Sequence, residues 1–533
     1  MDLSNHLIIA PILLPLLTGA LLLLFDERKH TLKALLSVGS TLLLVAMGMV
    51  LLRVADSGTA SVYLLGNWAA PFGIVLVLDR LSAVMLLVTS LLAIASLFFS
   101  LARWDKMGSH FHSLFQFLLM GLNGAFLTGD LFNLFVFFEV VLSASYGLLL
   151  HGSGPHRVRA GLHYIAMNLA ASFLFLVGVA LIYGVTGTLN MADLVGRIGE
   201  VPPENRFLLE AGAAILGIAF LVKAGMWPLC FWLPSAYSAA AAPVAAIFAV
   251  LSKMGIYVLL RLSPLLFGAA AGSSAGFDDK WLFAGGLVTL AFGTIGVLAS
   301  QAMVRLAAFS VLVSSGTLLA AVAMSGDRST AAALYYMISS TLTIGALFLL
   351  IELLERAQDP AAAVLSVTME AYGDGDEDEP EEEVGVTIPA TLAILGVSFG
   401  VCGILLSGLP PLSGFVGKFA LLSAAIDAGN KISTLNWFFF GLLITSGLFA
   451  MVAMVRAGIR IFWAPVEIIV PRVRVIEFVP VAFLLILCIW MTAQAGPTMR
   501  YLDAAANALH DPTGYVHDVL SAAPIPSPKE AGH

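Results

Sequence analysis

The chain has 533 residues, of which 59% are hydrophobic and only 11% are charged, and its formal net charge is -8. An ordinary soluble domain carries about 25% charged residues, so this composition excludes a soluble protein. Runs of about 20 apolar residues, the length that crosses a bilayer, recur along the whole chain. They are rich in Leu, Ala, Gly and Phe and lack the alternating pattern of an outer-membrane barrel. We therefore predict an all-α polytopic membrane protein.

The apolar runs predict about fourteen transmembrane helices. The first run, HLIIAPILLPLLTGALLLLF, is too long for a signal-peptide core and has no cleavage-like site, so it is predicted to be the first span. Two runs, 208–236 and 388–427, are too long for one plain helix and are interrupted by proline and glycine. An even number of spans places both termini on one face. The predicted spans are 6–25, 32–54, 80–102, 113–129, 131–150, 162–186, 208–236, 243–262, 281–300, 306–324, 331–354, 388–427, 436–460 and 477–495.

The order of the spans predicts five segments. Three helices lie in 1–103, runs of five follow in 113–262 and 281–460, one helix lies in 461–495, and 496–533 is a polar tail. Each run of five contains one interrupted helix, and paired interruptions indicate two related halves of a transporter. Because five is an odd number of spans, we expect two inverted five-helix repeats, the first of them a proton half-channel.

Two polar segments are predicted to be unfolded. The stretch EAYGDGDEDEPEEE, residues 370–383, holds nine carboxylates, more than the whole net charge, and a block of like charge stays solvated. It is interpreted as a flexible linker or as a device that concentrates cations near the membrane. The tail from Asp511 is also expected to be disordered.

No cofactor or metal site is expected. Cys230, Cys402 and Cys488 are far apart and follow no metal-ligand spacing, so they are interpreted as small apolar core residues. Most histidines lie in loops or tails, and no zinc-protease, phosphate-loop or dinucleotide motif occurs.

Four charged residues lie near the centres of predicted spans: Glu139, Lys223, Lys253 and Lys418. Each costs about 2.5–3.5 kcal/mol there unless it is paired or hydrated. Several such residues in one chain mark an ion or proton pathway. The alternative, structural ion pairs or side chains that reach the membrane surface, is less consistent with their midspan depth.

Lysine suits a proton relay in this setting. Burial disfavours its charged form, so it can gain and lose a proton, and a nearby glutamate favours the charged form. Arginine cannot take this part because it does not deprotonate in proteins. Helix breaks accompany the lysines: Pro228 and Pro234 follow the first, and Pro410 and Pro411 precede the last. Breaks inside a membrane are tolerated where protein or water satisfies the freed backbone groups.

These residues resemble the antiporter-like subunit family, which includes proton-translocating subunits of NADH:quinone oxidoreductase and large subunits of Mrp/Pha cation/proton antiporters. The matching motifs are LTGDLFNLFVFFEVVLSASYGLLLHG, LVKAGMWPLCFWLP, VLSKMGIYVLLR and SGLPPLSGFVGKFALL. The amino-terminal stretches APILLPLLTGALLLL and LGNWAAPFGIVLVLDRLSAVML are most similar to the D-type subunits of Mrp/Pha antiporters. The resemblance covers about residues 1–465.

The resemblance implies fourteen helices in two inverted repeats, with Glu139 on the fifth helix paired with Lys223 on the broken seventh. It also implies that Lys253 is the central relay and that Lys418, in the broken twelfth helix, is the terminal protonatable group. Many members carry a His and a Lys on the eleventh helix, where this chain has YYMISSTLTIGALFLL. A relay between Lys253 and Lys418 must then use water or the hydroxyls of Ser339, Ser340, Thr341 and Thr343.

The leading hypothesis is a subunit of a multisubunit antiporter that exchanges protons for Na⁺ or K⁺, for cation efflux and pH homeostasis. The alternative is a proton-pumping subunit of an NADH:quinone oxidoreductase-like or hydrogenase-like complex, and a third is an inert scaffold. The expected partners are other subunits of the same complex, the transported ions and the lipid bilayer, and not nucleic acid. The expected location is the bacterial inner membrane. A modest excess of Lys and Arg on the face opposite the termini makes that face cytoplasmic. Because Glu139 is alone among clear midspan acids, the cation is expected to pass at an interface with another subunit.

Overall fold

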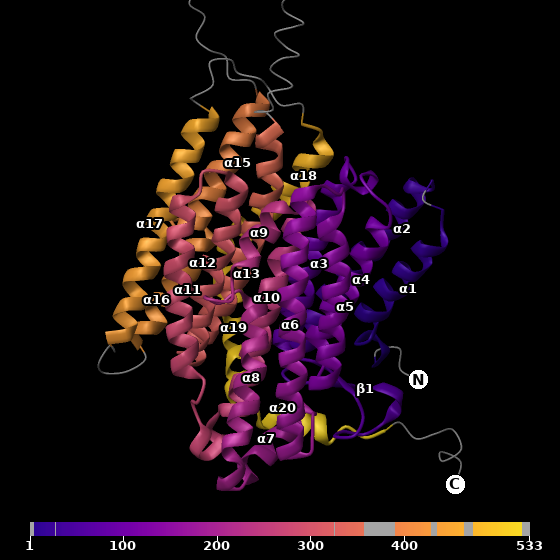
Figure 1. The fold of residues 1–533 in the computed structure, drawn as a ribbon, viewed down its shortest axis with the longest axis vertical. Coiled ribbons are helices and arrows are strands. Elements are labelled where there is room, and N and C mark those ends of the chain that lie inside the picture. The colour runs from indigo at the N-terminus through magenta and orange to yellow at the C-terminus, as the bar shows by residue number, and fades with distance from the viewer. Residues whose placement is uncertain are drawn as a thin grey trace, which may run out of the picture.

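The computed structural model describes residues 5–26, 28–324, 326–356, 390–427, 434–462 and 473–524. The predicted acidic segment 370–383 lies outside these residues. The described chain is mostly helical, and its helices run side by side as a bundle (Figure 1). It also contains one antiparallel hairpin, formed by β1 (Ser61–Leu64) and β2 (Val75–Leu78), which the sequence reasoning did not predict.

The described helices suit fourteen membrane crossings by length and composition, and the predicted all-α membrane fold is confirmed. Twelve helices are long and apolar enough to cross a bilayer, and the shorter apolar helices α1 and α4 add two more. The short apolar helix α16 completes the crossing that α15 begins, as α9 completes that of α8 (Figure 1). The spanning helices are α1 (Ala10–Leu24), α2 (His30–Ala55), α3 (Arg80–Ser100), α4 (Phe111–Leu127), α5 (Leu131–Leu150), α6 (Pro155–Thr186), α8 (Arg206–Ala224), α9 (Trp232–Ala239), α10 (Ala242–Phe267), α11 (Asp279–Ala299), α12 (Met303–Val322), α13 (Asp327–Glu355), α15 (Ala390–Ser407), α16 (Ser413–Asp427), α17 (Thr434–Phe462) and α18 (Val475–Ala493). The shorter elements are η1 (Asn5–Leu7), η2 (Leu65–Asn67), η3 (Trp104–Lys106), α7 (Met191–Glu200), η4 (Pro203–Asn205), η5 (Ala269–Ser274), α19 (Ala495–His510) and α20 (Thr513–Leu520).

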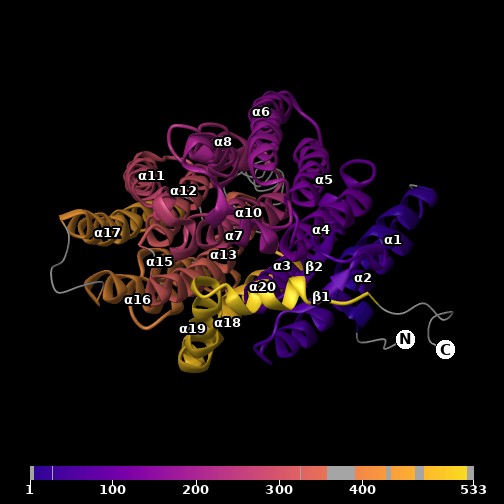
Figure 2. The same cartoon turned by 90° about the horizontal axis from the view of Figure 1, so that it is seen from below.

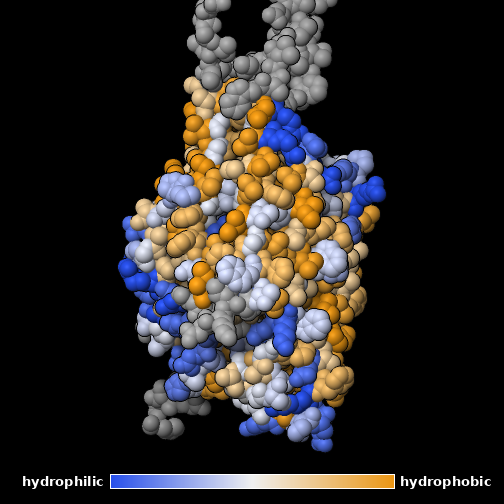
Figure 3. Space-filling model, turned by 90° about the vertical axis from the view of Figure 1, so that its left-hand side faces the viewer, coloured by the Kyte–Doolittle hydropathy of each residue, from blue (hydrophilic) through white to orange (hydrophobic). Residues whose placement is uncertain are grey.

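Helices α10 and α13 lie at the centre of the bundle (Figure 2). The most apolar stretch of α10 is entirely buried and that of α13 is 89% buried, against 39% for α17 at the periphery. On α17, Ile444, Leu448 and Val455 are more than half exposed, and hydrophobic residues cover much of the middle of this side (Figure 3). Lipid therefore meets the outer helices, while polar groups on α10 and α13 are shielded by protein.

The two broken helices are related by an inverted repeat. Each is the fourth span in its run of five, with α8 and α9 in the first run and α15 and α16 in the second. Along the chain, the first pair rises and the second pair descends in Figure 1. Both breaks open with a left-handed glycine of φ 74°, Gly225 and Gly408, and both have a proline three residues later. Glycine adopts this conformation at little steric cost and ends a helix there.

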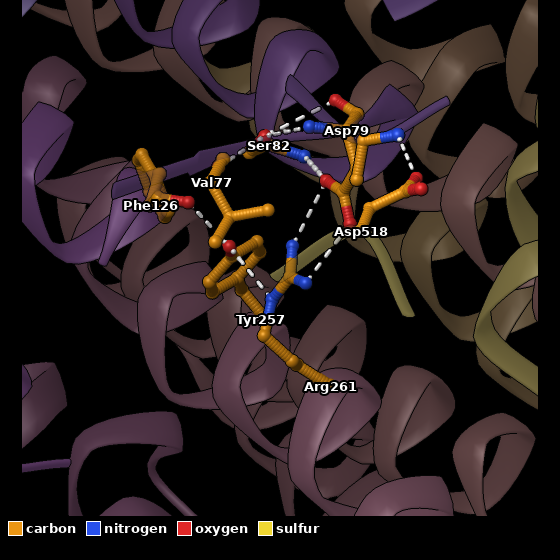
Figure 4. Close-up of polar contacts among 8 residues, drawn as sticks. Val77, Asp79, Ser82, Phe126, Tyr257, Arg261 and Asp518 are labelled. Carbon is orange, nitrogen blue, oxygen red and sulfur yellow. Dashed lines mark hydrogen bonds and ion pairs between the residues drawn. The ribbon is translucent and has the colours of Figure 1, made fainter. Parts of the chain in front are cut away.

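A largely buried ion pair joins the C-terminal end of α10 to the start of α3. Arg261 Nη1 and Nη2 donate to Asp79 Oδ2 and Oδ1, both at 2.9 Å (Figure 4). Asp79 also caps α3 by accepting a hydrogen bond from Ser82 N, and Tyr257 donates to the Phe126 carbonyl at 2.5 Å. Burial raises the pKa of the Asp79 carboxyl, but the charge and hydrogen bonds of Arg261, together with Ser82, hold it below its ordinary value.

The prediction that the tail is unfolded from Asp511 is wrong for residues up to 520, and the predicted polar tail begins with helices. There the chain forms α19 and α20, which pack against the bundle. Leu502 and Leu509 are buried because apolar residues recur at helical spacing and give α19 an apolar stripe within a polar composition. In α20, Asp518 accepts a hydrogen bond at 2.8 Å from the backbone next to β1.

Candidate functional site

Glu139 and Lys223 lie close to one another in the first repeat. Glu139, in the middle of α5, accepts a hydrogen bond from Ser172 Oγ of α6. Lys223 is buried near the end of α8, and its Nζ lies 5.6 Å from the centre of the Phe138 ring. Lys223 therefore lies beside the residue that precedes Glu139, although no direct ion pair joins Glu139 and Lys223 among the described residues. Their functional pairing stays a prediction.

The break after Lys223 is satisfied by protein groups. The helix ends at Gly225, and Pro228 lies in the connection to α9. Trp227 N in this connection donates to Thr289 Oγ1 of α11 at 2.9 Å. Pro234 is the third residue of α9, where a missing N–H removes no intrahelical hydrogen bond. The predicted prolines thus lie where the backbone changes course, and a helix of the second repeat completes the hydrogen bonding.

Lys253 lies on the central helix α10 and is only 1% exposed. Its Nζ donates to Ser314 Oγ of α12 at 2.8 Å. Ser314 Oγ in turn lies 2.9 Å from Ser340 Oγ of α13. The central lysine of the first repeat is therefore hydrogen-bonded to a chain of hydroxyls in the second.

Lys418 is held by the preceding half-helix. It lies on α16, and its Nζ donates to the carbonyls of Leu406 at 3.0 Å and Ser407 at 3.1 Å, at the end of α15. Carbonyls at a helix C-terminus have no intrahelical partners and carry partial negative charge, so they favour a cation. The predicted Pro410 and Pro411 lie between α15 and α16, in the connection that turns Lys418 back towards these carbonyls.

A second pair of serines and a small cavity lie between Lys253 and Lys418. Ser339 Oγ of α13 lies 2.8 Å from Ser413 Oγ, at the start of α16. A cavity of about 20 Å³ is lined by Ser339, Ser340, Ser314 and Leu406, among others. That volume holds about one water molecule. The cavity touches both the serines that lead to Lys253 and the residue whose carbonyl binds Lys418.

The predicted hydroxyls divide into two groups. Ser339, Ser340 and Thr343 line the cavity, and Thr343 Oγ1 also donates to Ser339 O at 2.8 Å. Thr341 instead donates to Met337 O of its own helix at 2.6 Å. The structure therefore brings three of the four named hydroxyls to the space between the lysines.

Sequence reasoning missed Ser314, Ser413 and Gly408. A Cβ on Gly408 would lie 2.5 Å from Lys418 Cδ, so this glycine leaves room for the lysine stem. Ser413 stands inside the motif SGLPPLSGFVGK, and Ser314 follows Ser310 by four residues within an apolar span. Spacing on one helix face was the available signal.

The three cysteines are buried and free, as expected for core residues. Among the described residues, no group of three or more His, Cys, Asp and Glu side chains is arranged to hold a metal ion.

Comparison with known proteins identifies the family of the chain. The family described as NADH:quinone oxidoreductase/Mrp antiporter, TM, matches residues 128–448. The chain is 62% identical to the D-type subunit of a probable K(+)/H(+) antiporter of Rhizobium meliloti strain 1021, over 98% of each chain. It is 34% identical to the D-type subunit of an Na(+)/H(+) antiporter of Alkalihalophilus pseudofirmus, over 97% of this chain and 99% of the relative.

Solved structures share the fold. A chain of the Mrp complex from Dietzia sp. DQ12-45-1b superposes with a TM-score of 0.81 at 27% identity, over 98% of this chain and 100% of that chain. A chain of respiratory complex I from Thermus thermophilus superposes with a TM-score of 0.74 at 23% identity, over 97% and 100%. The chain belongs to the NADH:quinone oxidoreductase/Mrp antiporter family of transmembrane proteins and, within it, to the D-type antiporter subunits.

Proposed function

We propose that this chain is the proton-translocating subunit of a multisubunit antiporter that exchanges protons for Na⁺ or K⁺. The support comes from relatives named as D-type subunits of K(+)/H(+) and Na(+)/H(+) antiporters and from the similarity to a chain of an Mrp complex. On this proposal the chain is a secondary transporter and not an enzyme. It works with other subunits of the same complex and serves cation efflux and pH homeostasis.

The observation that carries the proposal is the hydrogen-bonded connection between Lys253 and the second repeat. Lys253 donates to Ser314, which contacts Ser340, and both serines line the cavity that reaches Leu406 beside Lys418. Hydroxyls and water pass protons on, and buried amines can take up and release them.

In the first repeat, we propose that the charge of Glu139 acts on Lys223, whose Nζ lies 5.6 Å from the ring of the neighbouring Phe138. A charged Glu139 favours a protonated Lys223, and a neutral or displaced Glu139 favours release of that proton. We propose that the released proton passes to Lys253 and from there, through the serines and a water, to Lys418. The relay then links both broken helices.

We place the chain in the bacterial inner membrane with both termini on the external face, following the positive-inside bias of its loops. On this orientation, the end of the bundle where α13 ends and α10 begins is cytoplasmic. The cation is proposed to cross at an interface with a partner subunit.

The alternative of a redox-driven proton pump has less support. The similarity to complex I of Thermus thermophilus, at 23% identity, is a similarity of fold, whereas relatives at 62% and 34% identity are named as antiporter subunits.

The test is cation/proton exchange in everted vesicles from salt-sensitive cells that express the complete gene cluster. We expect Glu139→Ala and Lys223→Ala to abolish Na⁺/H⁺ and K⁺/H⁺ exchange while the complex still assembles. Lys280→Ala, which removes an exposed lysine at the start of α11, is the control and should exchange normally. Intact exchange in the first two variants would refute the relay, and NADH-driven pumping without exchange would favour the alternative.

A further inference from the structure

A large cavity, the vestibule, lies where α13 ends and α10 and α12 begin. Its volume is about 740 Å³. Its walls carry charge, with Arg157 at the start of α6, Arg356 at the end of α13 and Glu352 among the lining residues. Phe348 of α13 and Ala245 of α10 line its apolar part. Charged walls and this volume make the vestibule a water-filled space.

A layer of aromatic rings lies between the vestibule and the interior of the first repeat. Phe348, which lines the vestibule, lies 6.2 Å from the Tyr237 ring, and Tyr237 lies 5.7 Å from Phe248. Phe248 is stacked at 6.3 Å on Tyr164 of α6. These distances join ring centres, so each ring touches the next. Tyr164 thus lies against Phe248, at the end of this series of rings.

One face of α6 carries polar residues from the vestibule down to Glu139. Tyr164, Asn168 and Ser172 follow Arg157 by seven, eleven and fifteen residues, which places all four on the same side of a helix. At 1.5 Å per residue, this stripe spans about 22 Å. Ser172 at its far end donates a hydrogen bond to Glu139.

The polar groups in the stripe are buried, and one atom lacks a partner. Tyr164 OH lies 2.6 Å from Ser145 Oγ of α5, and both residues are at most 2% exposed. Asn168 is 0% exposed, and its Nδ2 donates to Tyr164 O at 2.8 Å. Asn168 Oδ1 accepts no hydrogen bond from any described residue. A buried acceptor of this kind is normally satisfied by an internal water.

We propose that Tyr164 and Asn168 form the proton path between the vestibule and Glu139. Water at Asn168 Oδ1 connects the Tyr164–Ser145 hydroxyl pair to the Ser172–Glu139 pair. This inference rests on the proposed function of Glu139 and adds the route by which protons reach it. The stripe would instead be purely structural if its polar groups served only to hydrogen-bond within α6.

The first test measures access to water without relying on transport. In the assembled complex, with Cys230, Cys402 and Cys488 replaced by alanine, Asn168→Cys is exposed to the small thiol reagent 2-aminoethyl methanethiosulfonate. Asn123→Cys is the matched control, because Asn123 of α4 is also buried but its amide is bonded to Pro11 O at 2.8 Å. We expect Asn168→Cys to react about tenfold faster or more, since thiol reactivity follows access to water. Equal rates would overturn the proposed path.

The second test measures exchange per assembled complex. Asn168→Leu, which fills the space without a polar group, should lower the exchange rate about tenfold, and Asn168→Ser, which leaves room for water, should restore most of it. Asn123→Leu should leave the rate near normal. If Ser and Leu at position 168 behave alike, the path is wrong.

The two tests separate this inference from the proposed function. If Glu139→Ala and Lys223→Ala still exchange ions, the relay fails whatever the labelling shows. If those variants are inactive but Asn168→Cys labels no faster than Asn123→Cys, the relay holds and protons reach Glu139 by another route. Where Asn168→Cys does not assemble, Ser145→Cys gives the same readout at the neighbouring hydroxyl.

Discussion

In the first repeat, Lys223 lies before its helix break, and its Nζ lies 5.6 Å from the ring of Phe138, the residue before Glu139 on another helix. In the second repeat, Lys418 lies after its break and donates to two backbone carbonyls of the preceding half-helix. The breaks themselves follow one plan, since Gly225 and Gly408 share a φ of 74°. Similar backbones therefore place their lysines in different surroundings, one beside a helix that carries a carboxylate and the other on backbone carbonyls.

The same difference recurs at the fifth helix of each repeat. Arg261 near the end of α10 pairs with the Asp79 carboxylate at 2.9 Å. Arg456 near the end of α17 donates to the carbonyls of Leu298 at 2.5 Å and Ser300 at 3.0 Å. A carboxylate loses its charge when it is protonated, whereas a carbonyl keeps its partial charge at any pH. On the proposed function, the first repeat is thus the half in which the environment of a buried cation can change.

The largest effect is expected at Lys418. Lys418→Met removes the amine and should lower exchange about a hundredfold or more, the scale of a lost acid–base group. Lys418→Arg keeps a cation beside the carbonyls but cannot release a proton, so it should be equally inactive in the vesicle assay. An active Lys418→Arg would show that the second repeat needs only a fixed charge there.

A smaller effect on exchange is expected when the glycine of either helix break is replaced by alanine. Gly408→Ala and Gly225→Ala each place a side chain in the left-handed region, at a cost of about 1 kcal/mol in stability. Only the first pushes on a lysine, because its Cβ would lie 2.5 Å from Lys418 Cδ. Gly408→Ala should therefore lose about tenfold in exchange through misplacement of the amine.

The readout for this pair is the exchange rate per complex, beside the melting temperature. Gly225→Ala should lower the melting temperature to a similar extent but keep most of the exchange. Equal loss of exchange in both would mean that the breaks act alike and that the position of the lysine is not the deciding difference.

The hydrogen-bonded serines between Lys253 and Lys418 should tolerate substitution better than the lysines or Gly408. Ser340→Ala removes one hydroxyl from the connection between Lys253 and Lys418, and water can replace part of it. We expect exchange to fall about fivefold, the effect of one hydrogen bond of about 1 kcal/mol. Thr341→Ala is the neighbouring control, since that hydroxyl bonds within its own helix. If both variants lose the same amount, the serine connection does not carry the proton.

The smallest effect is expected on the stability of the fold in acid, through the Asp79–Arg261 pair. Because the pKa of Asp79 is held below its ordinary value in the folded protein, the pair stabilises the fold at neutral pH, and this stability is lost as pH falls through the folded pKa. The melting temperature of the complex should therefore show an acid-dependent loss below about pH 4 that Asp79→Asn removes. A variant of the carbonyl-bound Arg456, such as Arg456→Gln, should leave that acid dependence unchanged.

Much of this protein follows from local properties of its sequence. Hydropathy over windows of about 20 residues predicted the spans, because each helix must cover the bilayer core on its own. The cost of a midspan charge selected Glu139, Lys223, Lys253 and Lys418, and glycine and proline marked the broken helices. Disorder from Asp511 was predicted wrongly because the eight-residue α20 is too short and polar to show a clear apolar pattern.

Only the tertiary structure decided which groups meet. Ser340 and Thr341 are neighbours of similar chemistry, yet a rotation of about 100° per residue turns one towards Ser314 and leaves the other on its own helix. The carbonyl partners of Lys418 carry no signal of their own in the sequence, because every residue has a carbonyl. The end of α15 frees these two, and only the packing of the two half-helices brings Lys418 to them. Depth in the membrane is a property of one helix at a time, whereas a proton path depends on how several helices are rotated against one another.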